Sequence, residues 1–418
     1  MHFYRSIAAF GLLSSVFLCT ASFGEPWRRL GPPIDGFTSH AAMLQLPTEP
    51  ERILIASRGN TSVAGGEHRG LWTSDDGGQT WQFADQSVGQ TINNNRGMVA
   101  GNQSGEVWLV QETSPNLCHS LDGGRTWDKT DAPFKHGICI VTDPGNKDRL
   151  WVGADDGLWR SDDLGQTWQS VTGGLPPDAR GVSNTLTAIA IDPTDANRMY
   201  AGFLYAAMDH PWGVYRSSDG GQTWQTANEG LPEGELILDF ATATNQKVKM
   251  ALPKYGLQYR AIKDLILDPA HPQTLYAITR QNGMYRTDDG ATTWQPVELP
   301  QGDSIHSNYL TGLSVDADGN RLIVGTGGLN VAVSTDCGDT WQMTGPLVPI
   351  QMDENKVVTV ELPWGAQKTG KPDQTVSQIL GGPYYSSVHR VHVDVTDPRI
   401  LYAETDAGIY VQTRRDSP

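Results

Sequence analysis

Carboxylate side chains are the first candidates for chemistry in this sequence. Six acids outside a repeated motif could do acid–base work: Asp155, Asp156, Asp209, Asp264, Glu404 and Asp406. Hydrolysis of a glycosidic bond needs two carboxyl groups at a defined separation, because one protonates the leaving oxygen while the other attacks the sugar or activates water. If the chain is an enzyme, the predicted catalytic residues are Asp264, Asp209 and Glu404. The sequence does not give their separation, so it leaves open whether the chain is an enzyme.

A second group of side chains suits binding. Imidazole, guanidinium, ammonium and amide groups hydrogen-bond polar ligands, while aromatic rings stack on sugars or anchor a protein partner. For each aromatic residue, packing against the rest of the fold is the alternative role. The predicted ligand-binding residues are His40, Arg96, His136, Arg260, Lys263, His306, Asn308, His389, Arg390, Trp212, Trp364 and Tyr384.

Three of these histidines could act together. His40, His306 and His389 fall in neighbouring repeats of the fold predicted below, and three adjoining imidazoles could bind a metal or supply a base. An ordinary hydrogen-bonded histidine is the alternative at each position. We predict no cofactor and assign no metal site.

A repeated element must position these side chains. The pattern Ser-x-Asp-x-Gly-x-Thr-Trp, an Asp-box, occurs at 74–81, 120–127, 161–168, 217–224 and 334–341. A degenerate copy at 287–294 has Thr287 for the Ser and Ala291 for the Gly. Between the boxes lie short runs rich in Val, Ile, Leu, Tyr and Trp, which indicate four strands per repeat. A repeat of about 40–50 residues with four short strands predicts a β-propeller blade.

The chemistry of the box suits a turn between the two outer strands of a blade. Its Asp can accept backbone N–H groups of its own loop, its Gly adopts an angle that other residues resist, and its Trp packs between sheets. We therefore predict structural roles for the box acids. Unequal insertions on one face of a repeat fold usually mark the binding face. Here they fall on the face opposite the boxes, at 58–69, 205–212, about 225–259 and about 342–387.

The number of blades can be inferred from the two ends of the chain. Six boxes indicate six blades, and residues 389–411 provide three more strands with no box. The segment that begins at Trp27 resembles the segment immediately after a box, so we expect it to supply the missing outer strand. Such closure removes open sheet edges. The predicted fold is an all-β, seven-bladed β-propeller whose last blade is closed by the N-terminal strand.

These boxes resemble the sialidase-like (BNR/Asp-box) propeller superfamily over residues 25–418. That superfamily includes sialidases, two-propeller xyloglucanases, sortilin-type receptors, and photosystem II assembly and stability factors. The sialidases place an Arg-Ile-Pro signature at the first inner strand, and the matching stretch 39–44 contains no Arg. The resemblance thus implies a protein that is not a true sialidase. In plan it is similar to the single-propeller assembly-factor-like and sortilin-like members.

The N-terminus predicts export. Residues 1–24 combine a weakly basic start, an apolar stretch too short for a membrane span, and small residues, as a signal peptide does. We expect cleavage near residue 24, a propeller over 25–418, no later membrane segment, and a secreted or periplasmic location. The net charge of −16 argues against a nucleic-acid partner. Cys118 and Cys139 could form a disulfide, with buried free thiols as the alternative.

These features predict an exported binding or assembly protein, expected to be a monomer. Its protein or glycan partner would be held on the face opposite the Asp-boxes. The alternative is a glycoside hydrolase or another carbohydrate-active enzyme, suggested by the acids and aromatic residues above. A fold of this kind hosts unrelated activities, so the fold alone does not decide between the two.

Overall fold

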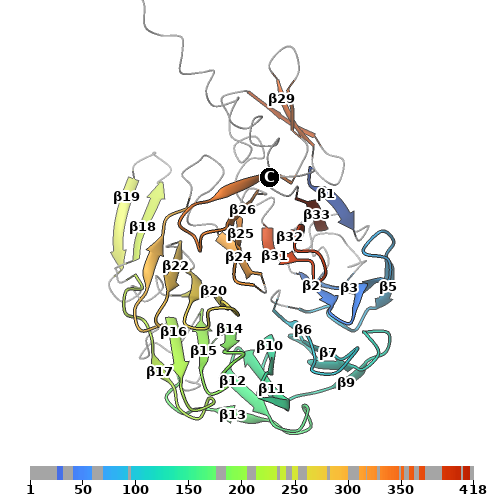
Figure 1. The fold of residues 1–418 in the computed structure, drawn as a ribbon, viewed down its shortest axis with the longest axis vertical. Helices are drawn as coiled ribbons and strands as arrows, with labels where there is room; N and C mark the ends of the chain where they lie inside the picture. The colour runs from blue at the N-terminus through green and yellow to red at the C-terminus, as the bar shows by residue number, and fades with distance from the viewer. Residues whose placement is uncertain are drawn as a thin grey trace, which may run out of the picture. The chain divides into compact units, whose positions relative to one another are not determined.

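The computed structural model describes most of the chain between residues 26 and 414 (Figure 1). The described residues are 26–31, 41–58, 69–92, 96–175, 185–204, 213–232, 236–241, 247–252, 261–279, 283–299, 310–316, 318–326, 330–347, 350–352, 357–361, 367–371, 388–405 and 408–414. The signal peptide predicted at 1–24 lies outside them. The described residues contain no helix with the length and apolarity that crossing a membrane requires.

All regular elements in these ranges are strands, and seven four-stranded antiparallel sheets form the blades. The predicted seven-bladed β-propeller is confirmed. The blades fall into two compact units, one built from residues 1–90, 299–316 and 320–418 and the other from 91–298 and 317–319.

The second unit holds four blades, each running in order from inner to outer strand. The first two blades are β6 (Met98–Ala100), β7 (Val107–Val110), β8 (Leu117–Ser120) and β9 (Asp128–Thr130), then β10 (Gly137–Asp143), β11 (Asn146–Ala154), β12 (Gly157–Ser161) and β13 (Gln169–Val171). The next two are β14 (Leu186–Ile191), β15 (Met199–Phe203), β16 (Gly213–Ser217) and β17 (Gln225–Thr226), then β20 (Ile262–Leu267), β21 (Leu275–Thr279), β22 (Met284–Thr287) and β23 (Gln295–Val297).

The first unit holds the other three blades. Two of them are β2 (Ala41–Leu46), β3 (Glu49–Ser57), β4 (Gly70–Ser74) and β5 (Gln82–Asp85), and β24 (Leu310–Val315), β25 (Leu322–Thr326), β26 (Asn330–Ser334) and β27 (Gln342–Pro346). The last blade is β31 (Val388–Val393), β32 (Ile400–Thr405), β33 (Gly408–Thr413) and β1 (Arg28–Gly31).

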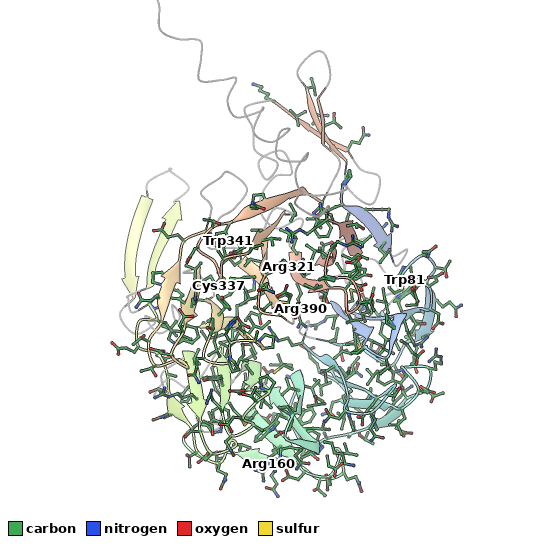
Figure 2. All side chains as sticks on the ribbon, viewed as in Figure 1. Trp81, Arg160, Arg321, Cys337, Trp341 and Arg390 are labelled. Carbon is green, nitrogen blue, oxygen red and sulfur yellow. The ribbon has the colours of Figure 1, made fainter. Side chains whose placement is uncertain are left out.

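The N-terminal strand completes the last blade, as predicted. β1 pairs antiparallel with β33, with Arg28 opposite Val411. Trp27 is 8% exposed, and its indole N–H donates to Thr344 Oγ1 at 3.0 Å. The box residue Trp81, labelled in Figure 2, donates its indole N–H to the Leu30 carbonyl at 3.1 Å. The first described strand is thus held by blades on both sides of it.

Two of the predicted insertions contain strands of their own. Between β17 and β20 lies a two-stranded sheet of β18 (Leu236–Ala241) and β19 (Lys247–Leu252). Between β27 and β31 lies a three-stranded sheet of β28 (Ile350–Met352), β29 (Val358–Glu361) and β30 (Gln367–Gly370). The sequence indicated the position of these insertions but not their strands.

The repeated eight-residue turn is held together by its acid. In the copy at 161–168, Asp163 Oδ1 accepts the Ser161 hydroxyl and the Thr167 N–H, both at 2.8 Å. Its Oδ2 accepts the Thr167 hydroxyl at 2.6 Å, and the Ser161 oxygen accepts the Gly165 N–H at 2.8 Å. Both oxygens of the Asp163 carboxylate are therefore hydrogen-bonded to residues of the same turn.

Backbone geometry explains the glycines of this turn and their exceptions. The two residues after each acid have positive φ, such as 67° at Gly77 and 84° at Gly78. Leu164, Ala291 and Cys337 occupy such positions with φ of 54°, 60° and 60°. Side chains are disfavoured there by about 1–2 kcal/mol, so the surrounding hydrogen bonds must compensate at these three sites.

Candidate binding site at the inner strands

Several inner strands contain a β-bulge close to their first residue. The bulge changes the direction of the side chains at that end of the strand. In the second unit, the register slips around Ile138 in β10, Thr187 in β14 and Lys263 in β20. In the first unit, β31 slips around His389 in the same way. Bulges are enriched next to functional sites because they change where a side chain points. Two predicted ligand-binding residues, Lys263 and His389, are therefore bulge residues.

Arg96 and Asp264 form an ion pair within the second unit. Asp264 Oδ1 accepts the Arg96 Nε–H at 2.6 Å and the Leu265 N–H at 2.9 Å, and it lies 2.5 Å from Arg96 Nη2. The Arg96 carbonyl accepts the Ile140 N–H of β10 at 3.1 Å, which holds this arginine against another blade. The pair joins residues from blades that are not consecutive in the chain, and Asp264 is only 3% exposed.

Cys139 of β10 lies in the electrostatic field of this pair. Its side chain is 1% exposed, and burial raises the pKa of the thiol to about 12. Cys118, Cys139 and Cys337 are all free thiols, so the disulfide considered from the sequence does not form. A thiol with so high a pKa stays protonated at neutral pH and is a poor nucleophile.

His136 and Asp155 form an accessible acid–imidazole pair at the inner end of one blade. His136 Nδ1 lies 2.8 Å from Asp155 Oδ2, and the Thr185 hydroxyl donates to Asp155 Oδ1 at 3.0 Å. The side chains of His136 and Asp155 are 55% and 27% exposed. His136 has a φ of 47°, a left-handed conformation that is uncommon outside glycine. Since it is exposed to solvent on one side and held by Asp155 on the other, this imidazole is available to a ligand.

The neighbouring acid is fixed by the same loop. The Lys135 N–H donates to both oxygens of Asp156, at 3.2 and 3.1 Å, and the Trp159 indole N–H donates to its Oδ1 at 3.0 Å. The Asp155 N–H in turn donates to the Lys135 carbonyl at 3.1 Å. Because Gly137 pairs with Ala154 and Ala154 with Gly157, these groups lie at the end of the blade away from the box at 161–168.

Glu404 of the first unit is enclosed. It is 0% exposed, and its Oε1 accepts the Met43 N–H at 2.8 Å and contacts His392 Nε2. The nearby His389 and Arg390 are half-buried. Figure 2 labels Arg390 on β31. Both described candidates for catalysis, Asp264 and Glu404, are thus buried and hydrogen-bonded, although the buried Oε2 of Glu404 has no partner among the described residues, and their catalytic role stays a prediction.

The remaining predicted site residues lie outside the described residues. Among the described side chains, no group of three or more His, Cys, Asp or Glu could hold a metal ion. The proposed association of His389 with two further histidines stays a prediction, because those two are not described. The residues outside the described part are His40, Asp209, Trp212, Arg260, His306, Asn308, Trp364 and Tyr384.

The sequence did not indicate which of the candidate groups meet. Arg96 and Asp264 were both singled out, but nothing in their 168-residue separation indicated a pair. Thr185 carried no signal in the sequence, although its hydroxyl orients Asp155. The position of the turn that contains Asp155 and Asp156 beside the start of β10 follows from the pairing of Gly137 with Ala154.

Comparison with known proteins finds relatives that are similar in sequence and solved structures that are similar in fold. A xyloglucanase of Paenibacillus sp is 34% identical over 236 residues, which cover 43% of this chain and 23% of that protein. An oligoxyloglucan-reducing end-specific xyloglucanase of Emericella nidulans is 26% identical over 228 residues, covering 49% of this chain and 27% of that protein. The chain therefore spans about a quarter of the length of these curated relatives. No family model matches the sequence.

Among solved structures, the chain resembles one described as YCF48 bound to D1 peptide. The TM-score is 0.53 at 16% identity, and the match covers 94% of this chain and 98% of that one. A second structure, described as YCF48 from Cyanidioschyzon merolae, gives a TM-score of 0.51 at 11% identity and covers 93% of this chain and 98% of that one. At these identities the likeness extends to the fold alone. It agrees with the propeller fold predicted from the boxes.

Proposed function

We propose that this chain is an exported, non-catalytic β-propeller that holds a protein or glycan partner on the face opposite its boxes. The observation that carries the proposal is a contrast in exposure. Asp264 and Glu404, the described candidates for catalysis, are 3% and 0% exposed and already hydrogen-bonded. Near the inner strands, His136 and Asp155 form an accessible polar pair, which suits recognition of a partner.

The rest of the proposal comes from the sequence. Residues 1–24 would be removed as a signal peptide and residues 25–418 would act as one propeller domain, monomeric, in the periplasm or outside the cell. The peptide named with the YCF48 structure supports a protein partner, and the xyloglucanase relatives support a glycan. In either case Lys263 would add a polar contact in the unit that holds the His136 pair, and His389 and Arg390 would supply polar contacts in the other unit.

A glycoside hydrolase is the second candidate, favoured by the 34% identity to a xyloglucanase. It would require two carboxyl groups that reach a sugar, one of them from residues such as Asp209 that lie outside the described part. Asp264 would have to exchange its bonds with Arg96 for contact with substrate. These requirements make the hydrolase the weaker of the two candidates.

The test uses a xyloglucan oligosaccharide and the D1 peptide as separate probes. We expect one of them to bind the wild-type chain in calorimetry, with no release of reducing ends from the oligosaccharide. His136→Ala should weaken that binding at least tenfold, whereas Gln169→Ala, an exposed change at the box end of the same blade, should not. Hydrolysis by the wild type would establish the glycoside hydrolase instead. Unchanged binding by His136→Ala would refute the proposed binding surface.

A further inference from the structure

An open surface pocket of about 330 Å³ lies in the second unit between the blades β14–β17 and β20–β23. It is on the box side, because Ser217 and Ser218 of one box and Asp289 and Gly290 of the next line it. Its volume is within the range of small-molecule sites. Its position is independent of the face assigned to the partner above.

A cross-strand pair shapes the pocket wall. Tyr200 of β15 is opposite Arg216 of β16, and in the preceding blade Trp151 is opposite Arg160. Trp151 packs on the next box so closely that a Cβ on Gly221 would lie 2.5 Å from its ring. Tyr200 has the smaller ring at the equivalent position, and the pocket opens beside it.

The Tyr200 hydroxyl makes no hydrogen bond with a described residue. The side chain is 1% exposed, and the hydroxyl would be 3.1 Å from a Cβ on Gly290. The equivalent Trp151 donates to Asp143 at 3.1 Å. In the blade of Tyr200 the corresponding acid, Asp192, instead accepts Arg198 Nη1 at 2.8 Å. The hydroxyl is not one of the buried polar atoms without a partner, so it is the accessible tip of an otherwise buried side chain that lines the pocket, where it can donate to a ligand.

Tyr200 is a neutral group near pH 7. Burial raises the pKa of its phenol to about 12. A neutral phenol beside a guanidinium is an additional donor for a negatively charged group.

Arg216 carries a charge that no described carboxylate within 4 Å neutralises. Its Nη1 donates to the Gly290 carbonyl at 3.4 Å and the Thr292 hydroxyl at 3.0 Å, and its buried Nε has no partner among the described residues. The arginine at the matching place in the next blade, Arg286, is paired with Asp288 at 2.9 Å. Arg216 therefore brings an uncompensated charge to this pocket, whereas its unpartnered Nε is buried, as is that of Arg160 in the preceding blade.

The acid in the pocket wall, Asp289, is hydrogen-bonded within its own box. Burial opposes ionisation of the Asp289 carboxyl, but hydrogen bonds from Thr293 and Thr287 outweigh it and hold its pKa at about 2. Its oxygens accept the N–H and hydroxyl of Thr293 at 2.9 and 2.7 Å. Asp289 therefore stays ionised and opposes an anion near it. Arg198 is balanced by Asp192, and Arg216 is the remaining cation in the pocket wall that can attract a ligand.

We propose that this pocket binds the oxyanion group of a small ligand, with Arg216 as the charged donor and Tyr200 as the second. Guanidinium groups bind carboxylate, sulfate and phosphate groups through two parallel N–H donors, and the pairing is strongest away from water. Gln273, whose side-chain oxygen would lie 2.8 Å from a Cβ on Gly290, lines the pocket together with the phenol. The ligand is a small molecule that carries one such group.

Equilibrium dialysis of the whole chain with radiolabelled acetate, sulfate and phosphate, at constant ionic strength, tests the proposal. We expect saturable binding of at least one anion at one site per chain, and the three arms identify the oxyanion. Arg216→Gln should weaken binding at least tenfold and Tyr200→Phe about threefold, since a charged hydrogen bond is worth more than a neutral one. Tyr200→Trp, which copies Trp151 of the preceding blade, should abolish it.

The matched control is Arg160→Gln. Arg160, labelled in Figure 2, occupies the position of Arg216 in the preceding blade but is paired with Asp162 at 3.0 Å. Binding should be the same in this variant as in the wild type. Lack of saturable binding for all three anions, or equal binding by a folded Arg216→Gln variant, would overturn the proposal. Tyr200→Phe removes only the hydroxyl, so it keeps the test valid should Tyr200→Trp not fold.

Discussion

Replacement of Asp264 by Asn should destabilise the protein substantially, because it breaks a buried ion pair without changing its size. The side chains of Arg96 and Asp264 are 13% and 5% exposed. Removing one partner of such a pair leaves an uncompensated buried charge and costs about 3–5 kcal/mol. The Asn oxygen can still accept the Leu265 N–H, so that bond adds nothing to the loss. We expect the free energy of unfolding to fall by about 3 kcal/mol, the lower end of that range.

Urea unfolding followed by tryptophan fluorescence measures this change. The matched control is Arg399→Gln, which breaks the pair between Arg399 and Asp397, whose side chains are 51% and 27% exposed. An exposed pair contributes less than about 1 kcal/mol because solvent screens it. A loss for Asp264→Asn no larger than that of the control would refute the structural role of the Arg96–Asp264 pair.

Three further outcomes are expected from burial and protonation. Trp27→Ala should lower the free energy of unfolding by about 3–5 kcal/mol, and a loss below about 1 kcal/mol in urea unfolding would contradict closure of the last blade by β1. The side-chain hydrogen bond from Thr223 lowers the Asp219 pKa from 3.8 to about 2. The unfolded chain therefore binds more protons in this window, and the stabilisation should be complete above about pH 4 and lost as the pH falls towards about 2. Near-UV circular dichroism with urea should show it, and equal stability at about pH 4.5 and 2.5 would contradict it. Cys139 should not react with a disulfide reagent at about pH 8 until guanidinium unfolds the chain, and rapid labelling of the native thiol would show that it is not buried.

Much of the fold could be predicted because the interactions that define it join residues close together in the sequence. The box at 161–168 closes its turn with residues no more than four positions apart, so the motif and its geometry are visible together. The strand at Trp27 could be assigned by its likeness to the segment immediately after a box. The strands β18 and β19 could not be assigned in this way, because their insertion does not repeat elsewhere in the chain.

The candidate site was predictable only as a set of residue types. His136 and Asp155 were both named, yet their contact depends on a left-handed residue facing the turn between β11 and β12. Asp264 was named as a catalytic candidate, whereas its partner, Arg96, comes from a distant blade. Contacts between side chains of different blades do not follow the repeat of the sequence, so the sequence pattern does not predict them.

The sequence by itself determined the blade, the number of blades and the strand that closes the last one. Each of these rests on hydrogen bonds and strand patterns that recur along the chain, and six copies of one motif reinforce them. Only the tertiary structure decided which carboxylates are available. Burial and pairing depend on neighbours from other blades, and these enclose Asp264 and Glu404 while leaving His136 and Asp155 accessible. Likewise, the pocket beside Tyr200 is lined by residues of two blades, so it exists only once they are packed together.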